Sequence, residues 1–195
     1  LVGSEMCIRD RLTKSYDELV LRRKSISSWA KLSAGWLGRS PDHIASSMVG
    51  QVMGLNVFEN HSPDRAKALL DYFNWARDQD HYMTYVIINP QANRNKNISE
   101  QKDEFLATAV VDEDSEGITV RGGKMLGTGS IMANEILFAN IQPLMPGEEK
   151  YAISFAIPMN TKGLKIMSRK SYEETATSTY DLSLIHISEP TRPPE

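Results

Sequence analysis

Residues 62–90 read SPDRAKALLDYFNWARDQDHYMTYVIINP, and this stretch decides the fold because its hydrophobic period changes midway. Ser62, Pro63 and Asp64 form a helix start, with a side-chain cap, a preset φ and an acid at the positive end of the helix dipole. Apolar residues then recur at helical spacing: Ala66, Leu69, Leu70, Phe73, Trp75 and Ala76. From Tyr82 to Ile88, β-branched and aromatic residues dominate. The stretch predicts a helix that leads directly into a strand.

The residues before this stretch predict two more helices. In the first, apolar residues recur every three or four positions up to Gly35: Leu12, Tyr16, Leu19, Val20, Ile26, Trp29 and Leu32. The second begins at Ser40-Pro41-Asp42 by the same capping argument. Its expected apolar face contains Ile44, Met48, Val52 and Leu55.

The residues after Tyr82 predict strands only. The expected strands are Tyr82–Ile88, Phe105–Val111, Ile118–Met125, Glu135–Ile141, Tyr151–Ile157 and Leu164–Met167, with a turn at Asp112–Gly117. Strands and helices do not alternate, so βαβ units are not expected. The chain is therefore predicted to be α+β, with a helical segment followed by an antiparallel β segment.

Both ends of the chain are expected to be foreign to the protein. Residues 182–192 read LSLIHISEPTR, which back-translates to the mosaic-end adapter of a transposase sequencing library. Residues 1–10 read LVGSEMCIRD and fit the reverse complement of that adapter. We therefore expect residues 1–11 and 182–195 to be non-native, 12–81 to form a helical domain and 82–181 a β domain. The only cysteine, Cys7, lies in the foreign part, which excludes disulfides and iron–sulfur clusters from the native segment.

Charge and hydropathy exclude several classes of partner. The formal net charge of −3 gives no reason to expect nucleic acid or an anionic membrane. No apolar run approaches the roughly 18–20 residues that span a bilayer. A basic segment followed by an apolar one, as in a signal peptide, is also missing, so a cytoplasmic location is expected.

The first motif with chemical potential is Gly35-Trp36-Leu37-Gly38-Arg39-Ser40-Pro41-Asp42-His43. Arg39 immediately precedes a helix N-terminus, so its guanidinium and the free backbone N–H groups can together favour an oxygen anion. His43 follows one turn into the helix. An ordinary interhelical turn with a solvated arginine explains the same pattern.

The second motif, Asn89-Pro90-Gln91-Ala92-Asn93-Arg94, ends a strand and opens a polar loop. Its amides can bind the edge of a flavin ring or a sugar, and its arginine can bind a phosphate. A polar surface loop remains the alternative.

The third motif, Gly122-Gly123-Lys124-Met125-Leu126-Gly127-Thr128-Gly129-Ser130, lies between strands and is therefore neither a P-loop nor a dinucleotide fingerprint. The glycines on either side of Thr128 would let a flat ligand approach the backbone. A bulge or tight turn explains them equally well.

In order and spacing, these motifs resemble the 4-hydroxyphenylacetate 3-monooxygenase oxygenase family. The similar strings are Gly38–Asp42, Asn89-Pro90-Gln91 with Arg94, Val120–Lys124 with Thr128, Glu149–Ala152 and Phe155–Pro158. The resemblance implies an acyl-CoA dehydrogenase-like fold: an N-terminal helical domain, a middle β-barrel and a C-terminal helical bundle, of which this chain lacks the bundle.

The resemblance also implies a reaction. Reduced FAD, supplied by a separate NAD(P)H-dependent reductase, reacts with O2, and one oxygen atom is transferred ortho to the hydroxyl of a phenolic substrate. The full-length enzyme is expected to be a homo-oligomer, a dimer or a tetramer.

Particular residues correspond to the family's site. Arg39 matches the arginine that binds the substrate hydroxyl; Asn89, Gln91, Asn93, Arg94 and Thr128 fall in its flavin-binding stretches. His43 stands where the family has a tyrosine, and Tyr85 where it has a histidine. We expect these two to have exchanged places around one phenol oxygen, with His43 as the base.

The family's carboxylate-binding pair falls at Asn140-Ile141. The side chain of Ile141 cannot hold a carboxylate, so another phenol or a chlorophenol is the expected substrate. Three alternatives are a non-catalytic flavin-binding paralogue, an acyl-CoA dehydrogenase and a 4-hydroxybutyryl-CoA dehydratase. The dehydratase needs cluster-binding cysteines, which the native segment lacks.

Overall fold

The computed structural model describes residues 12–34, 42–90, 93 and 95–168. The chain divides into two compact units, 1–162 and 163–195, and every helix and strand below belongs to the first. The strand expected at Leu164–Met167 is wrong. No other strand pairs with these residues within the described part, and Met167 is 92% exposed. The terminal segments expected to be foreign lie outside the described residues.

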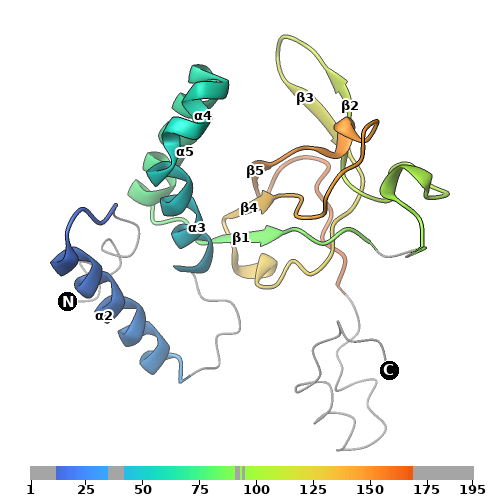
Figure 1. Cartoon of the computed structure of the whole chain (residues 1–195). Helices are drawn as coiled ribbons and strands as arrows, with labels where there is room; N and C mark the ends of the chain where they lie inside the picture. Colours follow the sequence, from blue (N-terminus) through green and yellow to red (C-terminus); the bar gives the residue numbers. More distant parts are fainter. Residues whose placement is uncertain (1–11, 35–41, 91–92, 94, 169–195) are drawn as a thin grey trace, which may run out of the picture. The chain divides into compact units, whose positions relative to one another are not determined.

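Among the described residues, the helical part consists of α2 Tyr16–Leu32, α3 Asp42–Met53, α4 Leu55–His61 and α5 Pro63–Asp78 (Figure 1). The predicted start of α5 is confirmed, because the Ser62 side chain accepts a hydrogen bond from the backbone N–H of Arg65. The second predicted helix is interrupted at Gly54, and Leu55 begins α4 instead. Glycine is a poor helix former, which explains why the break falls there.

The strands form two small sheets (Figure 1). The three-stranded sheet has the order β1 Met83–Val86, β4 Glu135–Phe138, β5 Phe155–Pro158; the other pairs β2 Ala109–Glu113 with β3 Ile118–Arg121. Three short 3₁₀ helices lie in the connections: η1 Ile98–Glu100, η2 Ser130–Met132 and η3 Glu149–Tyr151. The β4–β5 and β2–β3 pairs are antiparallel.

The expectation of an antiparallel barrel needs correction. β1 and β4 pair in parallel, with Met83 opposite Glu135. The connection from Val86 to Glu135 far exceeds the dozen or so residues that a parallel crossover requires. The sheets formed by the described residues do not close into a barrel.

Several expected strand limits also shift. β2 begins at Ala109, later than expected, and continues to Glu113, which lies in the expected turn. A bulge between Val110 and Asp112 shifts the register of its pairing with β3. β3 ends at Arg121 because Gly122 has a φ of +122°, which breaks the extended backbone. Tyr151 lies in η3, and the strand expected from it begins only at Phe155.

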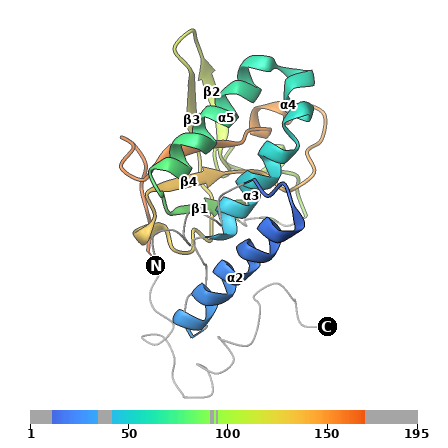
Figure 2. The same ribbon diagram turned by 90° about the vertical axis from the view of Figure 1, so that its left-hand side faces the viewer.

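One apolar core joins α3 and α5 to the start of β1. Its buried members are Ile44, Met48, Val49, Val52, Phe73, Ala76 and Met83. A polar contact adds to this packing, because the Tyr72 hydroxyl on α5 donates to the Glu135 carboxylate on β4 over 3.0 Å. Burial and the adjacent Glu135 charge raise the pKa of Tyr72. In Figure 2, α3 and α5 are both seen beside β1.

A second core lies under the β2–β3 hairpin. Ala107, Ala109 and Tyr151 are buried there, with Ile98 and Leu144 packed against them. β2 contacts η3, so this core joins the hairpin to the segment before β5.

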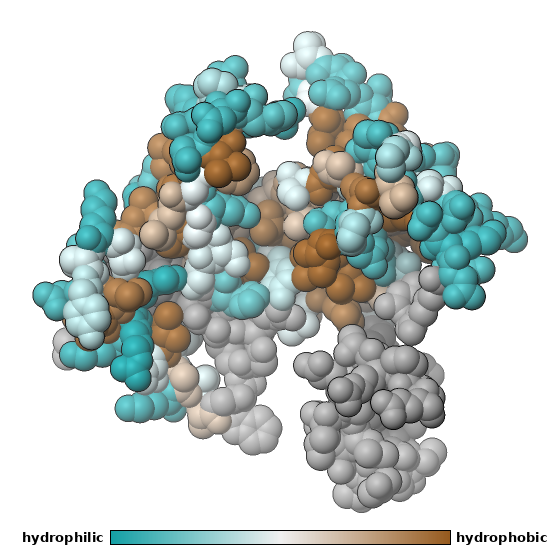
Figure 3. All heavy atoms as spheres, viewed as in Figure 1, coloured by the Kyte–Doolittle hydropathy of each residue, from teal (hydrophilic) through white to brown (hydrophobic). Residues whose placement is uncertain are grey.

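The predicted apolar face of α2 is largely uncovered by the described residues. Tyr16 is 79% exposed, Leu19 51% and Leu32 83%. Figure 3 shows apolar side chains at the surface of the helices as well as over the strands. The periodicity therefore predicted the helix correctly, but its face is not buried within this part of the chain. None of the described helices is both long and apolar enough to cross a membrane.

Candidate functional site

Strand β1 brings the three predicted motifs together. Its residues contact the first motif through Tyr85 and the third through Thr84. Just past its end, Asn89 of the second motif binds Lys124 of the third. Successive strand residues point to opposite faces, so the contacts of Thr84 and Tyr85 lie on opposite sides of the strand.

His43 and Tyr85 lie in contact. Their ring centroids are 5.1 Å apart and their planes are inclined by 29°, which is a stacked arrangement. His43 is exposed in the first turn of α3, whereas Tyr85 is half-buried against the helical core. The structure therefore brings together the two residues expected to face one phenol oxygen. Arg39, expected beside them, lies outside the described residues.

The glycine-rich loop is held against β1 by its own backbone. The fully buried Thr84 hydroxyl donates to the carbonyl of Thr128 over 2.6 Å. Gly129 has a φ of +80°, and a Cβ there would lie 2.7 Å from the Tyr82 hydroxyl. The Tyr82 side chain therefore occupies the space that the missing side chain of Gly129 leaves, so this glycine serves internal packing. The side chain of Thr128 stays exposed and accessible to a ligand.

Asn89 is engaged at both ends of its amide. Its Oδ1 accepts from the Lys124 ammonium over 2.6 Å, and its Nδ2 donates to Gln142 Oε1 over 2.9 Å. Burial lowers the pKa of Lys124. Asn89 therefore joins three segments and has little capacity left for a flavin. The sequence singled out neither Lys124 nor Gln142 as an individual residue, because a lysine after two glycines and a lone glutamine carry no distinctive signal.

The loop after Asn89 borders a cavity of about 460 Å³ that opens to solvent. The lining residues are Asn93, Lys96, Gln101, Lys102, Asp103 and Leu106. The Gln101 amide is consumed internally: its Nε2 donates to the carbonyls of Asn93, Lys96 and Asn97. No ion pair involves the two lysines within the described residues. Gln91 and Arg94, the other predicted flavin ligands of this loop, lie outside them.

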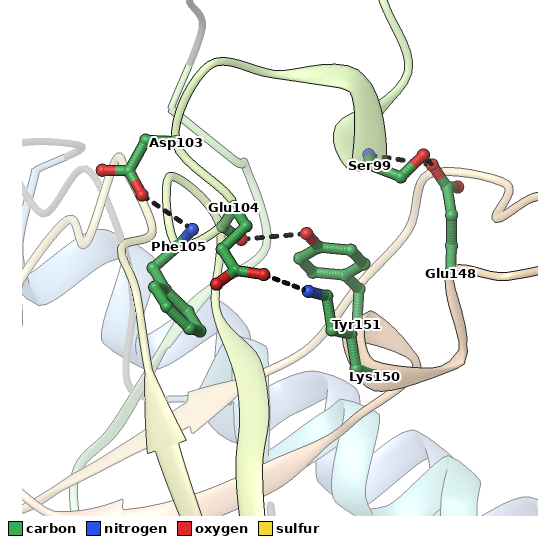
Figure 4. Close-up of polar contacts among 7 residues, drawn as sticks. All are labelled: Ser99, Asp103, Glu104, Phe105, Glu148, Lys150 and Tyr151. Carbon is green, nitrogen blue, oxygen red and sulfur yellow. Dashed lines mark hydrogen bonds and ion pairs between the residues drawn. The ribbon is translucent and has the colours of Figure 1, made fainter.

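The far side of this loop is tied to η3 (Figure 4). The Tyr151 hydroxyl donates to the carbonyl of Glu104 over 2.9 Å, and Lys150 forms an ion pair with the Glu104 carboxylate at 2.9 Å. The Phe105 ring lies beneath two cations, with Arg121 4.7 Å and Lys150 5.8 Å from its centroid.

Asn140, another predicted substrate residue, has a side-chain amide with unused hydrogen-bonding capacity. Both polar atoms of its amide are buried, and neither has a partner within the described part of the chain. Buried polar groups are rarely left in this state, so the amide suits a ligand group. Its neighbour Ile141 is 61% exposed.

Comparison with known proteins reveals many relatives. The family profile described as 4-hydroxyphenylacetate 3-hydroxylase N terminal matches residues 2–191. The 4-hydroxyphenylacetate 3-monooxygenase oxygenase component of Geobacillus sp. (strain PA-9) is 35% identical over 159 residues, which cover 80% of this chain and 32% of the relative. The oxygenase component of 4-nitrophenol 2-monooxygenase from Rhodococcus sp. is 35% identical over 166 residues, 85% of this chain and 30% of that protein.

Solved structures agree with this relationship. The oxygenase component (HpaB) of 4-hydroxyphenylacetate 3-monooxygenase, complexed with FAD and 4-hydroxyphenylacetate, matches with a TM-score of 0.73 at 32% identity, covering 80% of this chain and 32% of that one. An oxygen-tolerant archaeal 4-hydroxybutyryl-CoA dehydratase from N. maritimus matches with a TM-score of 0.67 at 26% identity over 80% of this chain and 31% of that one.

The chain spans about a third of the length of the curated relatives it matches. The profile match nevertheless covers nearly all of its residues, and the matching structures share its fold over most of its length. The chain therefore belongs to the 4-hydroxyphenylacetate 3-hydroxylase family, whose N-terminal part it matches.

Proposed function

We propose that the full-length protein carrying this sequence is the oxygenase component of a two-component monooxygenase. It hydroxylates a phenol ortho to its hydroxyl group, with reduced FAD and O2 as co-substrates. A separate NAD(P)H-dependent reductase supplies the reduced flavin. The similarity to monooxygenase oxygenase components supports this assignment, as does the match to a structure with FAD and a phenol bound.

The observation that carries the proposal is the contact between His43 and Tyr85. The ring centroids are 5.1 Å apart, so both side chains lie in one place on the surface where a phenol could contact them. A phenol ring attacks an electrophilic oxygen more readily once its hydroxyl proton is removed. Histidine changes charge near neutral pH and suits the task of base, while the tyrosine hydroxyl can donate a hydrogen bond to the resulting phenolate. Arg39, three residues before the first residue of α3 in the sequence, would stabilise that negative charge.

The loop that lines the cavity, from Asn93 to Leu106, is called the cofactor end below. Its side chains suit the binding of a flavin dinucleotide. Lys96 and Lys102 line the cavity beside Asn93 and form no ion pair within the described residues, so their ammonium groups suit phosphate oxygens. Gln91 and Arg94 would extend this surface, and the exposed Thr128 would contact the ring system. When bound, reduced FAD would activate O2 for transfer to the substrate. Asn89 holds this end in place from inside the protein.

The substrate differs from 4-hydroxyphenylacetate in this proposal. Asn140 offers an amide whose two polar atoms are buried without a partner, and it would bind a polar substituent of the phenol. Ile141 adds an apolar surface, which disfavours a carboxylate at that position. A phenol with a neutral or halogen substituent fits this pair better.

The remaining features of the family are part of the same proposal. Residues 12–81 would form the helical domain, and 82–181 the β domain that closes into a barrel in the complete protein. A C-terminal helical bundle would follow, and the enzyme would be a cytoplasmic homo-oligomer.

The test compares His43→Ala and Tyr85→Phe in the full-length protein with His61→Ala, which removes an exposed histidine of α4. Catechol formation is measured with a flavin reductase and NADH over a panel of phenols. We expect kcat/KM to fall roughly 100-fold or more for His43→Ala and roughly tenfold for Tyr85→Phe. His61→Ala should match the wild type.

Two outcomes would count against the proposal. If His43→Ala and Tyr85→Phe both turn over phenols normally, the base and donor are elsewhere. If the wild type binds FAD tightly but hydroxylates no phenol, the protein is a non-catalytic flavin-binding relative.

A further inference from the structure

A buried carboxylate joins two loops that are far apart in the sequence. Glu148 is only 2% exposed. Its Oε1 accepts hydrogen bonds from the backbone N–H of Ser99 over 3.1 Å and from the Ser99 hydroxyl over 2.7 Å (Figure 4). Its Oε2 accepts from the backbone N–H of Met145 over 2.9 Å. A glutamate is rarely buried to this extent unless its oxygens are hydrogen-bonded.

The contacts favour the ionised form of Glu148. Two of its three donors are backbone N–H groups, which can only donate a hydrogen bond, and both carboxyl oxygens act as acceptors. These bonds, first from Met145 and then from the Ser99 hydroxyl, keep the pKa of Glu148 below its usual range. Hydrogen bonds to an ionised group are shorter and stronger than neutral ones.

The segment that Glu148 holds is a preformed unit. Asn97 and Glu100 cap η1 reciprocally, and the Gln101 amide joins the backbone at Asn93, Lys96 and Asn97. These bonds join Asn93 and residues 95–101 and fix the shape of that segment, but they do not fix its place on the β part. That attachment comes from the packing of Ile98 on the second core, from the hydrogen bonds of Ser99 to Glu148 and, further along, from the contacts of Glu104 with Lys150 and Tyr151.

The position of this segment determines the cavity. Asn93, Lys96 and Gln101 belong to the segment. Lys102 and Asp103 follow it, before the second attachment point at Glu104, and Leu106 lies two residues beyond Glu104. If the Ser99 attachment were released, the first half of the lining could move while the second half stayed tied to η3. The two lysines would then lose their fixed spacing.

We propose that Glu148 is a positioning residue of the cofactor end. Its carboxylate fixes the segment made of Asn93 and residues 95–101, and so holds the cavity in its binding geometry before the ligand arrives. This inference rests on the proposed function, because it takes reduced FAD to be the ligand of that cavity. Glu148 itself does not contact the ligand. It strengthens binding because a loop that is already ordered loses less conformational entropy when the ligand binds.

The test uses Glu148→Gln in the full-length oxygenase. The amide keeps the shape of the side chain but turns one accepting oxygen into a donor that faces an N–H group. Glu149→Gln is the matched control, since it makes the same change at the adjacent, exposed residue. Ser99→Ala, which removes one of the three hydrogen bonds, provides a milder variant in case Glu148→Gln does not fold.

Two quantities are measured: the reduced-FAD concentration that gives half-maximal velocity, and kcat at saturating flavin. For Glu148→Gln we expect the reduced-FAD concentration for half-maximal velocity to rise roughly tenfold or more, the equivalent of losing a hydrogen bond to a charged group. The kcat at saturating flavin should stay near the wild-type value. Ser99→Ala should show a smaller rise, and Glu149→Gln none. Amide hydrogen exchange over residues 95–106 should accelerate in Glu148→Gln and not in the control.

The outcomes separate the two claims. If the wild type shows no response to reduced FAD, the proposed function fails. If the wild type responds but the folded Glu148→Gln and Ser99→Ala variants have unchanged flavin half-saturation, the positioning role is overturned and the function stands. A fall in kcat alone would also overturn it, because a loop that only sets binding geometry should not slow the saturated enzyme.

Discussion

The two ends of the candidate site are held by different forces. His43 and Tyr85 lie beside a core of apolar side chains from α3, α5 and β1, where Phe73 and Met48 are each 3% exposed. The loop after Asn93, which we propose binds the cofactor, rests on a smaller core of Ala107, Ala109 and Tyr151, with Ile98 and Leu144 packed beside it, and is otherwise held mainly by hydrogen bonds. Packing dominates at the first end and polar contacts at the second.

This difference predicts how each end responds to change. Apolar burial is non-directional and nearly independent of pH, so the substrate end should tolerate changes in solution conditions but not a loss of volume. Hydrogen bonds to a carboxylate depend on its ionisation and on donor geometry, so the cofactor end should respond to pH and to single polar substitutions.

Phe73→Ala should have the largest effect and would test the packed end. Removing a buried aromatic ring leaves a cavity and costs about 3–5 kcal/mol in the free energy of unfolding. Urea denaturation of the full-length protein measures this loss, which should be the same at pH 5 and pH 8. Leu19→Ala on α2 is the control, because Leu19 is 51% exposed and the change should cost under about 0.5 kcal/mol. A cost for Phe73→Ala near that of the control would mean that the helical core is not packed as described.

Gly122→Ala should destabilise the polar end by about 3 kcal/mol. Gly122 has a φ of +122°, and a Cβ there would lie 2.2 Å from the carbonyl oxygen of Ala107, which is backbone and cannot move aside easily. Thermal unfolding of the full-length protein measures the loss. Gly50→Ala in α3 meets no atom within 4 Å and should be neutral or stabilising by up to about 1 kcal/mol. Equal melting temperatures for the two variants would contradict the backbone conformation at Gly122.

Glu148→Gln should cost about 1.5 kcal/mol at neutral pH, and this cost should depend on pH. The pKa of Glu148 in the folded state lies below the ordinary 4.5, so its carboxylate stabilises the fold above that pH. The stabilisation is lost as the pH falls through the folded-state value. Unfolding measured from pH 7 down to pH 3 should show wild type and variant converging at the acidic end. If the difference in unfolding free energy between wild type and variant is the same at every pH, the ionisation of Glu148 does not contribute to stability.

Lys124→Met should have the smallest effect, about 1 kcal/mol. The methionine keeps the apolar stem but removes the hydrogen bond to Asn89, while it also removes a half-buried charge whose desolvation opposes folding. Lys31→Met on α2, at an exposed position, is the control. Chemical denaturation measures the unfolding free energy of both variants. A variant more stable than the wild type would mean that desolvating Lys124 costs more than its bond to Asn89 contributes.

The sequence predicted local features well. Ser62 and Pro63 marked the start of α5, and the change of period placed β1 directly after it. The family resemblance came from short strings at ordered spacing, and of the residues it singled out, His43 and Tyr85 do lie in contact. These features depend on neighbours in the chain or on a family's pattern of motifs, and both can be read without a structure.

The contacts between distant segments could not be predicted in this way. Glu148 and Glu149 are adjacent and chemically identical, yet one is buried with three donors and the other is exposed. Two of those three donors belong to Ser99, 49 residues away in the sequence. The parallel pairing of β1 with β4 was missed for the same reason, because alternation along a strand does not reveal the direction of its partner.

That parallel pairing has a consequence for how the protein is made. Met83 pairs with Glu135, so β1 leaves the ribosome 52 residues ahead of its partner. At common rates of synthesis this is a wait of roughly 3–10 s. During this time the segment Met83–Val86 has no strand to pair with, and its apolar side chains have only the helices already made to cover them. Early folding of α3 and α5 would therefore protect the nascent chain from aggregation until β4 emerges.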